Sequence, residues 1–176
     1  MRKLYITLLI SCGLISLKGQ NVLWQKDIKS ATQNLLSGLS VTVDQQFVIA
    51  GSSIQPPKVT TISTSGEIKQ NNGYDFHLVK LDQNGDEVWE QYFSGNNHDF
   101  LVSTISTQEG GFLLAGTTFS SQGLSKKDKS FGDSDIWIIK VAENGIEEWQ
   151  QSFGTIGKEE AKAVVQCKDL SYIVAG

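Results

Sequence analysis

The 176-residue sequence predicts an all-β fold in which antiparallel sheets recur along the chain. The first observation is that Trp24, Trp89 and Trp149 lie 65 and 60 residues apart, each 27 residues before the glycine of an Ala-Gly pair. Such self-similarity is typical of repeat architectures. The second is that an Asn-Gly pair precedes the later two tryptophans, as in β-hairpins. The third is that no apolar stripe of helical period follows residue 19.

The first 19 residues have the pattern of a signal peptide. Arg2 and Lys3 precede an apolar run that Lys18 interrupts before it reaches the length of a membrane-spanning helix. We therefore expect an exported protein, extracellular or on the cell surface, with no transmembrane segment in the mature chain. Two alternatives are lipid attachment at Cys12 and a buried N-terminal strand or helix.

The net charge limits the classes of partner, and the cysteine content limits the disulfides that the chain can form. Without residues 1–19 the chain has 12 basic and 19 acidic residues, a net charge of −7. Such a chain is repelled by phosphate backbones, so we expect no nucleic acid partner. Only Cys167 lies beyond the signal, which excludes an intrachain disulfide framework.

Residues 75–93 align without a gap on residues 135–153, with shared Asp, Lys, Asn-Gly, Glu, Trp, Gln and Phe positions. The Asn-Gly pairs are Asn84-Gly85 and Asn144-Gly145. We expect both residues of each pair to have positive φ in a type I′ turn. Each turn then joins an apolar strand to the strand that carries the tryptophan.

The repeat units expected are 22–53, 73–119 and 133–176, separated by long loops at 54–72 and 120–132. The first unit has three expected strands, beginning with a tryptophan strand at 22–27, and the other two have four each. The remaining strands include 76–81 and 136–141, 100–107 and 160–167, and 47–51, 112–116 and 172–176. Several are apolar on both faces, as strands between two layers are.

Four antiparallel strands every 60–65 residues, buried on both faces, predict an incomplete β-propeller of about 11 strands in two to three blades. We expect the tryptophans to fill the space between blades. Gly51, Gly116 and Gly176 should permit close backbone approach. Because propellers have roughly 4 to 8 blades, we expect the N-terminal part of a longer chain, with 22–27 completing the last blade. The alternative is self-association of several copies.

The pattern Asp-x-x-Leu-Val-Lys-Leu-Asp-x-Asn-Gly-x-x-x-Trp, followed by Gly-Gly-Phe-Leu-Leu-Ala-Gly, resembles propeller-like repeats of secreted and surface proteins of gliding-type Gram-negative bacteria. Many of these use the type IX secretion route. Within these 176 residues no C-terminal sorting domain follows the repeats, which leaves the route open. A weaker similarity links the Gly-x-x-x-Trp spacing at 85–89 and 145–149 to quinoprotein-like propellers. Those carry Thr-Gly where this chain has Asn-Gly, so we expect no cofactor.

The functional expectation is a non-catalytic module for binding or surface display. Lys126, Lys127 and Lys129, in the second long loop, are candidates to contact an acidic glycan or a partner protein, with a solvated variable loop as the simpler interpretation. No residue set predicts a catalytic, cofactor or metal site. The alternative function is a quinoprotein-like or glycan-active propeller enzyme whose catalytic residues lie in missing blades.

Single residues carry weaker expectations. Asp82, Asn84 and Asp86 alternate like the start of a calcium loop, but turn chemistry explains them better, because the next unit replaces both acids. His77 aligns with Trp137 and is expected to pack. Asp99 and Glu159 are equivalent acids, expected at turns or edges.

Overall fold

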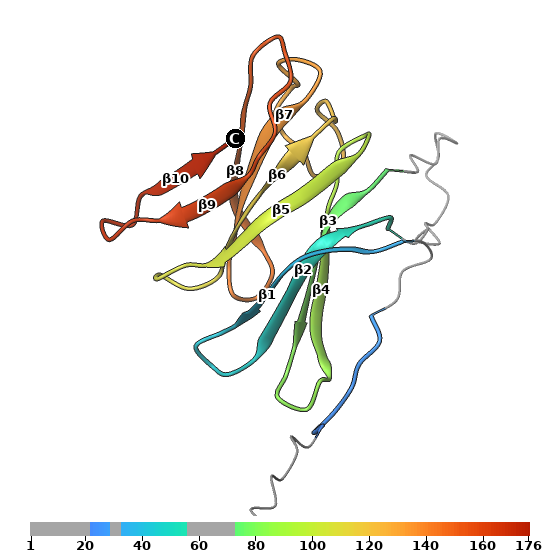
Figure 1. Cartoon of the computed structure of the whole chain (residues 1–176), viewed down its shortest axis with the longest axis vertical. Coiled ribbons are helices and arrows are strands. Elements are labelled where there is room, and N and C mark those ends of the chain that lie inside the picture. Colours follow the sequence, from blue (N-terminus) through green and yellow to red (C-terminus); the bar gives the residue numbers. More distant parts are fainter. Residues whose placement is uncertain (1–21, 29–32, 56–72) are drawn as a thin grey trace, which may run out of the picture.

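Residues 22–28, 33–55 and 73–176 are described by a computed structural model (Figure 1). Residues 1–21, which include the expected signal peptide and Cys12, residues 29–32, and residues 56–72 of the first long loop lie outside these ranges. The described residues form ten antiparallel β-strands and no helix, so the all-β prediction is confirmed and no described segment could cross a membrane as a helix. The strands are β1 (Leu35–Val41), β2 (Phe47–Ser53), β3 (Asp75–Leu81), β4 (Glu87–Phe93), β5 (Asp99–Ser106), β6 (Phe112–Thr118), β7 (Asp135–Val141), β8 (Glu147–Phe153), β9 (Ala163–Gln166) and β10 (Tyr172–Ala175).

The strands form three sheets in which each strand pairs with its neighbour in sequence. The first sheet has the order β1-β2-β3-β4, the second β5-β6-β7-β8, and the third consists of β9 and β10. The sheets succeed one another along the molecule (Figure 1). The first strands lie together, because β5 contacts both β1 and β9. Within the described residues the sheets do not close into a ring.

The sheets are out of phase with the sequence units. Unit 73–119 contributes β3 and β4 to the first sheet and β5 and β6 to the second. A repeat has the same period whichever residue is taken as its start. The repeat alone therefore could not show which strands share a sheet. The strand expected at 22–27 is wrong: residues 22–28 form no strand, and the described count is ten instead of 11.

The Asn-Gly hairpins differ from the expected type I′ turn. Positive φ occurs at Gly85 (82°) and Gly145 (84°), but not at the preceding asparagines. The Gly85 amide donates to the Asp82 carbonyl at 3.1 Å. The pairing of β3 with β4 then shifts register, as it does between β7 and β8. One left-handed glycine followed by a bulge makes the same reversal without a strained asparagine.

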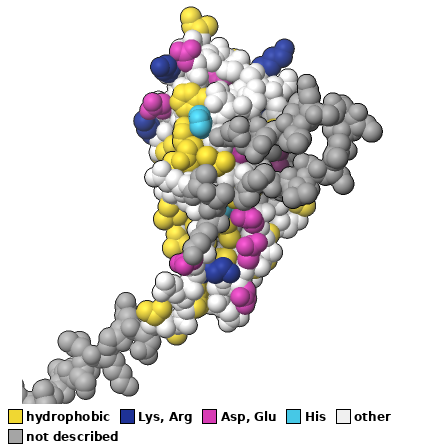
Figure 2. Space-filling model, turned by 90° about the vertical axis from the view of Figure 1, so that its right-hand side faces the viewer, with side chains coloured by type: hydrophobic (Ala, Val, Ile, Leu, Met, Phe, Trp, Pro, Cys, Tyr) yellow, Lys and Arg dark blue, Asp and Glu magenta, His cyan; other side chains and the backbone are white. Residues whose placement is uncertain are grey.

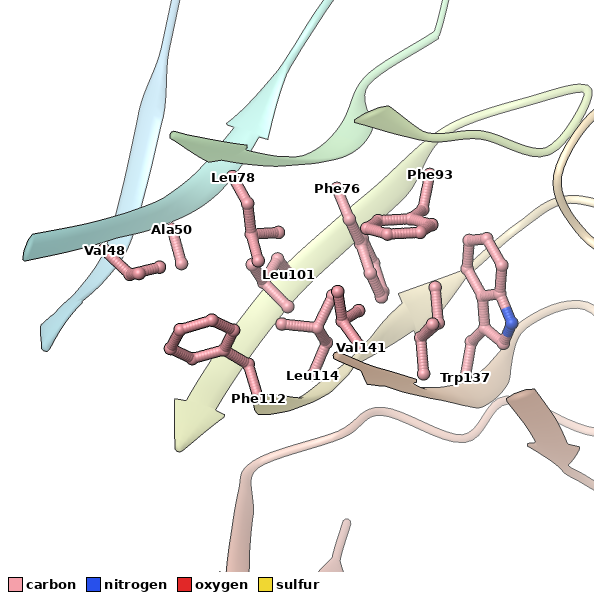
Figure 3. Close-up of a cluster of buried hydrophobic side chains, with 11 residues drawn as sticks. Val48, Ala50, Phe76, Leu78, Phe93, Leu101, Phe112, Leu114, Trp137 and Val141 are labelled. Atoms are coloured by element: carbon pink, nitrogen blue, oxygen red, sulfur yellow. The ribbon is translucent and has the colours of Figure 1, made fainter. Parts of the chain in front are cut away.

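The main core lies between the first and second sheets (Figure 3). Its buried residues are Val48, Ala50, Phe76, Leu78, Phe93, Leu101, Phe112, Leu114, Trp137, Ile139 and Val141. A smaller cluster of Leu113, Ala115, Ile138 and Val164 lies between the second and third sheets. Every residue of β3 is buried, as is every residue of β7 except Ile136, which confirms burial of the two strands expected to be sandwiched, and β6 is fully buried too.

The repeated glycines sit where backbones approach closely, as predicted. A Cβ on Gly116 would lie 2.3 Å from the Phe100 carbonyl oxygen and 2.4 Å from the Phe76 ring. A Cβ on Gly51 would lie 2.2 Å from a carbonyl oxygen of β1, and one on Gly176 would lie 2.3 Å from the Glu160 oxygen. A side chain at these positions would force strands apart.

Candidate functional site

Trp89 of β4 joins the first sheet to the second. Its indole Nε1 donates a hydrogen bond to the Glu143 carbonyl oxygen at 3.1 Å, in the turn between β7 and β8. A Cβ on Gly145 would lie 3.1 Å from the indole, so the ring covers the turn glycine. The ring also meets Phe112 of β6 edge-on, with centroids 6.2 Å apart. We call this set of contacts, an indole on an aromatic ring and an Asn-Gly turn, a tryptophan joint.

Trp24 makes the same joint one repeat earlier. Its Nε1 donates to the Gln83 carbonyl oxygen at 2.9 Å, and a Cβ on Gly85 would lie 2.7 Å from its ring. Its aromatic neighbour is Phe47, at 5.5 Å between centroids. Trp24 therefore packs on the first sheet without belonging to a strand itself.

Trp149 has only half of the joint. Its ring lies 5.9 Å from Tyr172 of β10, the counterpart of Phe47 and Phe112. The residue is 40% exposed, and within the described ranges its indole N–H has no hydrogen-bond acceptor. The aromatic residue that follows each tryptophan by 23 positions is the sequence signal that would have revealed this joint.

The three loop lysines do not form one exposed patch. Lys126 is 1% exposed, and its Nζ donates to the Asp128 carbonyl at 2.9 Å and to Ser152 Oγ at 3.0 Å. Nζ also lies 6.0 Å from the centre of the Trp137 ring. Burial lowers the pKa of Lys126, against the opposing effect of nearby aspartates. Its predicted role in contacting a partner is therefore wrong: this lysine pins the loop.

Lys127 and Lys129 remain exposed on the second long loop. The Lys127 side chain is 69% exposed and forms an ion pair with Glu147 at 2.6 Å. The loop itself is fixed against β8, because the Ser152 amide donates to Asp128 Oδ2 at 2.8 Å. Both lysines thus lie on the surface of an ordered loop, Lys127 in an ion pair with Glu147.

Asp99 closes a turn at the start of the edge strand β5, as expected, but its carboxylate is buried. Its carboxylate accepts hydrogen bonds from the Gly95 amide at 2.7 Å, Thr118 Oγ1 at 2.5 Å and Ser120 Oγ at 3.1 Å. Burial raises the pKa of Asp99, although these donors oppose the shift. Its counterpart Glu159 closes a similar turn by accepting from the Thr155 amide at 3.0 Å.

His77 lies in a chain of polar contacts beside a pocket. Its Nδ1 is 2.5 Å from Ser53 Oγ and its Nε2 is 2.8 Å from Glu90 Oε1, while its ring stacks on Tyr92 at 4.1 Å. Burial lowers the pKa of His77, against Glu90. A neutral ring with its proton on Nε2 satisfies both partners.

The pocket of about 170 Å³ beside His77 lies on the face of the first sheet away from the second, and Leu36, Ile49 and Val79 help line it. Ser53 is 1% exposed, which leaves a substrate no direct access to its hydroxyl. At the equivalent place in the second sheet, Trp137 Nε1 donates to Gln150 Oε1 at 3.1 Å. The contact between β3 and β4 thus recurs between β7 and β8, which makes it structural. Alignment of the units equated His77 with Trp137 but did not show that they bind Glu90 and Gln150.

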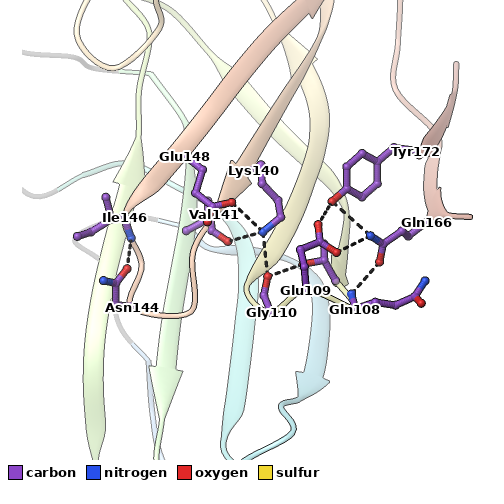
Figure 4. A network of polar contacts seen from close by, with 11 residues as sticks. Gln108, Glu109, Gly110, Lys140, Val141, Asn144, Ile146, Glu148, Gln166 and Tyr172 are labelled. Carbon is purple, nitrogen blue, oxygen red and sulfur yellow. Dashed lines mark hydrogen bonds and ion pairs between the residues drawn. The ribbon is translucent and has the colours of Figure 1, made fainter. Parts of the chain in front are cut away.

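A polar network ties the second sheet to the third (Figure 4). Gln166 of β9 donates to Glu109 Oε2 at 2.6 Å, and the Tyr172 hydroxyl donates to the same carboxylate. Buried Lys140 donates to the Gly110 carbonyl at 2.9 Å and pairs with Glu148 at 3.1 Å. The repeated lysine of the sequence thus holds a neighbouring hairpin turn.

Acidic residues do not converge on a cation site in the described ranges, where no group of three potential metal ligands occurs. Asp82 instead accepts the amides of Asn84 at 2.8 Å and Asp86 at 2.9 Å, which confirms turn chemistry for these residues. Comparison with protein-family models gives no match, and neither does comparison with curated proteins.

Proposed function

We propose that the chain is part of an exported, non-catalytic β-propeller that serves binding or surface display. The observation that carries this proposal is the tryptophan joint, which recurs with the same partners at Trp24 and Trp89 and is half-built at Trp149. The joint at Trp89 links the first sheet to the second, and the half-built joint at Trp149 links the second to the third, so successive sheets are related by a similar step. Radial repetition of four-stranded sheets is the architecture of a propeller.

The packing of the strands supports the same arrangement. β5 contacts both β1 and β9, the first strands of the neighbouring sheets, whereas β4 and β8 are the last strands of their sheets. The first strands would therefore line the axis of the ring. The sequence alone leaves the innermost strand undetermined.

Apolar faces at both ends of the stack support additional sheets. On the third sheet the cross-strand partners Val165 and Ile173 are 52% and 57% exposed. The far face of the first sheet holds the apolar pocket beside His77. Hydrophobic side chains also gather on the face seen in Figure 2. Further blades would bury such surfaces, which a stable monomer rarely leaves open.

Export is proposed from the pattern of residues 1–19 and from the resemblance to type IX secreted repeats. Binding is proposed from Lys127 and Lys129, which an ordered loop presents to solvent beside an otherwise acidic chain. The partner that fits two such cations is an acidic glycan or an acidic protein surface.

A glycan-array screen of the purified chain, with Lys127→Ala/Lys129→Ala as the variant, tests the binding proposal. We expect retention of acidic glycans that the double variant loses. Lys162→Ala, another lysine in a surface ion pair, is the matched control and should bind as the parent does. Hydrolysis of the sugar, or a quinone extracted from the purified protein, would favour the enzyme alternative instead.

A further inference from the structure

We propose that Trp149, Tyr172 and the outer edge of β10 form a docking site for a β-hairpin with an Asn-Gly turn, supplied by a further repeat of the same type. Trp24 and Trp89 each have both halves of the joint, an aromatic ring and a turn. Among the described residues, Trp149 has its aromatic ring, Tyr172, but no turn. The missing half of the joint, an Asn-Gly turn, identifies what should dock there.

The completed second sheet gives the register of the incoming hairpin. Phe112 of β6 pairs with Val141 of β7, and Ala115 pairs with Ile138. Tyr172 and Ala175 occupy the same places on β10, which in the described chain pairs only with β9. An added strand can extend such an open edge by backbone hydrogen bonds.

Glycine in the turn is required by the indole. A Cβ would lie 3.1 Å from the ring of Trp89 at Gly145, and 2.7 Å from that of Trp24 at Gly85. Both glycines also have left-handed φ angles, which side chains disfavour. The carbonyl two residues before each glycine accepts the indole N–H. An incoming turn would give Trp149 the acceptor that it lacks.

The charges of this chain also match those of the proposed hairpin. In the first sheet, buried Lys80 of β3 forms an ion pair with Asp44, in the turn between β1 and β2, at 3.5 Å. Asp169 occupies the same position in the turn between β9 and β10. A lysine of an incoming hairpin would therefore meet Asp169 as Lys80 meets Asp44.

The source of the hairpin is a further repeat and not a second copy. In this chain the two Asn-Gly hairpins are parts of complete four-stranded sheets, so a second copy would have to unfold a sheet to offer one. The inference rests on the propeller arrangement proposed above, but not on export or on ligand binding.

The test uses a fluorescein-labelled peptide with the sequence of residues 135–153 and the 176-residue chain, followed by fluorescence anisotropy. We expect saturable binding that weakens at least tenfold when Trp149→Ala is made in the chain. Gly145→Val in the peptide should have the same effect. Trp24→Ala, at the joint already filled, is the control and should change the affinity less than twofold. Equal binding by the Trp149→Ala chain or by the Gly145→Val peptide would overturn the proposal.

Because isolated hairpins are marginally stable in water, a second measurement places the hairpin in the same chain. A copy of residues 117–153 is joined directly after Gly176, the counterpart of Gly116. We expect the melting temperature to rise by several degrees, and Trp149→Ala to cancel the rise. An unchanged melting temperature would overturn the proposal. Dimers that require Trp149 and do not bind the peptide would also overturn the proposal, because the site would then hold a second copy of the chain.

The outcomes separate this inference from the binding function. Hairpin docking without any glycan retention would reject the lysine-loop binding proposal alone. Glycan retention that Lys127→Ala/Lys129→Ala abolishes, without hairpin docking, would reject this inference alone.

Discussion

Trp89 and Glu143, 54 residues apart in sequence, are joined by a hydrogen bond of 3.1 Å from the indole Nε1 to the backbone carbonyl oxygen. This bond connects the outer strand of the first sheet to a hairpin turn of the second. The indole also packs against the main apolar core. One side chain therefore supplies both packing and a polar contact between the sheets.

Trp89→Ala should lower the free energy of unfolding by about 3 kcal/mol, because removal of a large aromatic side chain from a packed interface leaves a cavity. Urea denaturation measures the loss. Trp149→Ala is the control, and its loss should be clearly smaller, since Trp149 has no turn to cover. A loss below about 1 kcal/mol for Trp89→Ala would show that the joint does not hold the sheets together.

Lys126→Ala should cost about 3 kcal/mol of unfolding free energy, since it removes the donor to the Asp128 carbonyl and Ser152 Oγ and leaves buried acceptors unpaired. Lys127→Ala, one residue along the same loop, should cost less than about 0.5 kcal/mol because its ion pair is exposed. Chemical denaturation of both variants provides the comparison. Equal losses would mean that Lys126 is solvated in solution.

Asp99→Ala should destabilise the chain by about 2 to 3 kcal/mol, because three buried donors lose their acceptor. The donors are the Gly95 amide and the hydroxyls of Thr118 and Ser120. Glu159→Ala, at the equivalent but more exposed position, should cause a smaller loss. Thermal melts of the two variants test this order, and a larger effect at Glu159 would contradict it.

Strand positions could be predicted from sequence because local chemistry sets them. Left-handed glycine is needed at Gly85 and Gly145, and runs of apolar residues on both faces mark the sandwiched strands. The grouping of strands into sheets depends on pairing partners far along the chain, which a periodic sequence does not distinguish. Residues 22–28 have strand-like composition, but in the structure they pair with no strand.

The site residues were less predictable because burial depends on tertiary packing. Lys126 and Lys127 look alike in sequence, but only the first points beneath its loop toward Trp137 and Ser152. Asp99 and Glu159 occupy equivalent positions and both accept from a nearby hydroxyl, but Asp99 is fully buried and Glu159 is only half-buried. Alignment of the units could equate these residues but could not say which environment each would meet.

His77 should make stability depend on pH between 7.5 and 5.5. Burial holds its pKa below the ordinary value of 6.5, despite the carboxylate of Glu90, so near pH 6.5 the unfolded chain binds a proton that the folded chain does not. The free energy of unfolding should therefore fall as the pH drops through 6.5. The fall ends once the pH lies below the pKa of His77 in the folded state. Urea midpoints at pH 7.5, 6.5 and 5.5 measure this dependence. His77→Phe retains an aromatic ring to stack on Tyr92 but cannot titrate, so its midpoints should vary less over this range. An equal slope in parent and variant would show that His77 is not the source of the pH dependence.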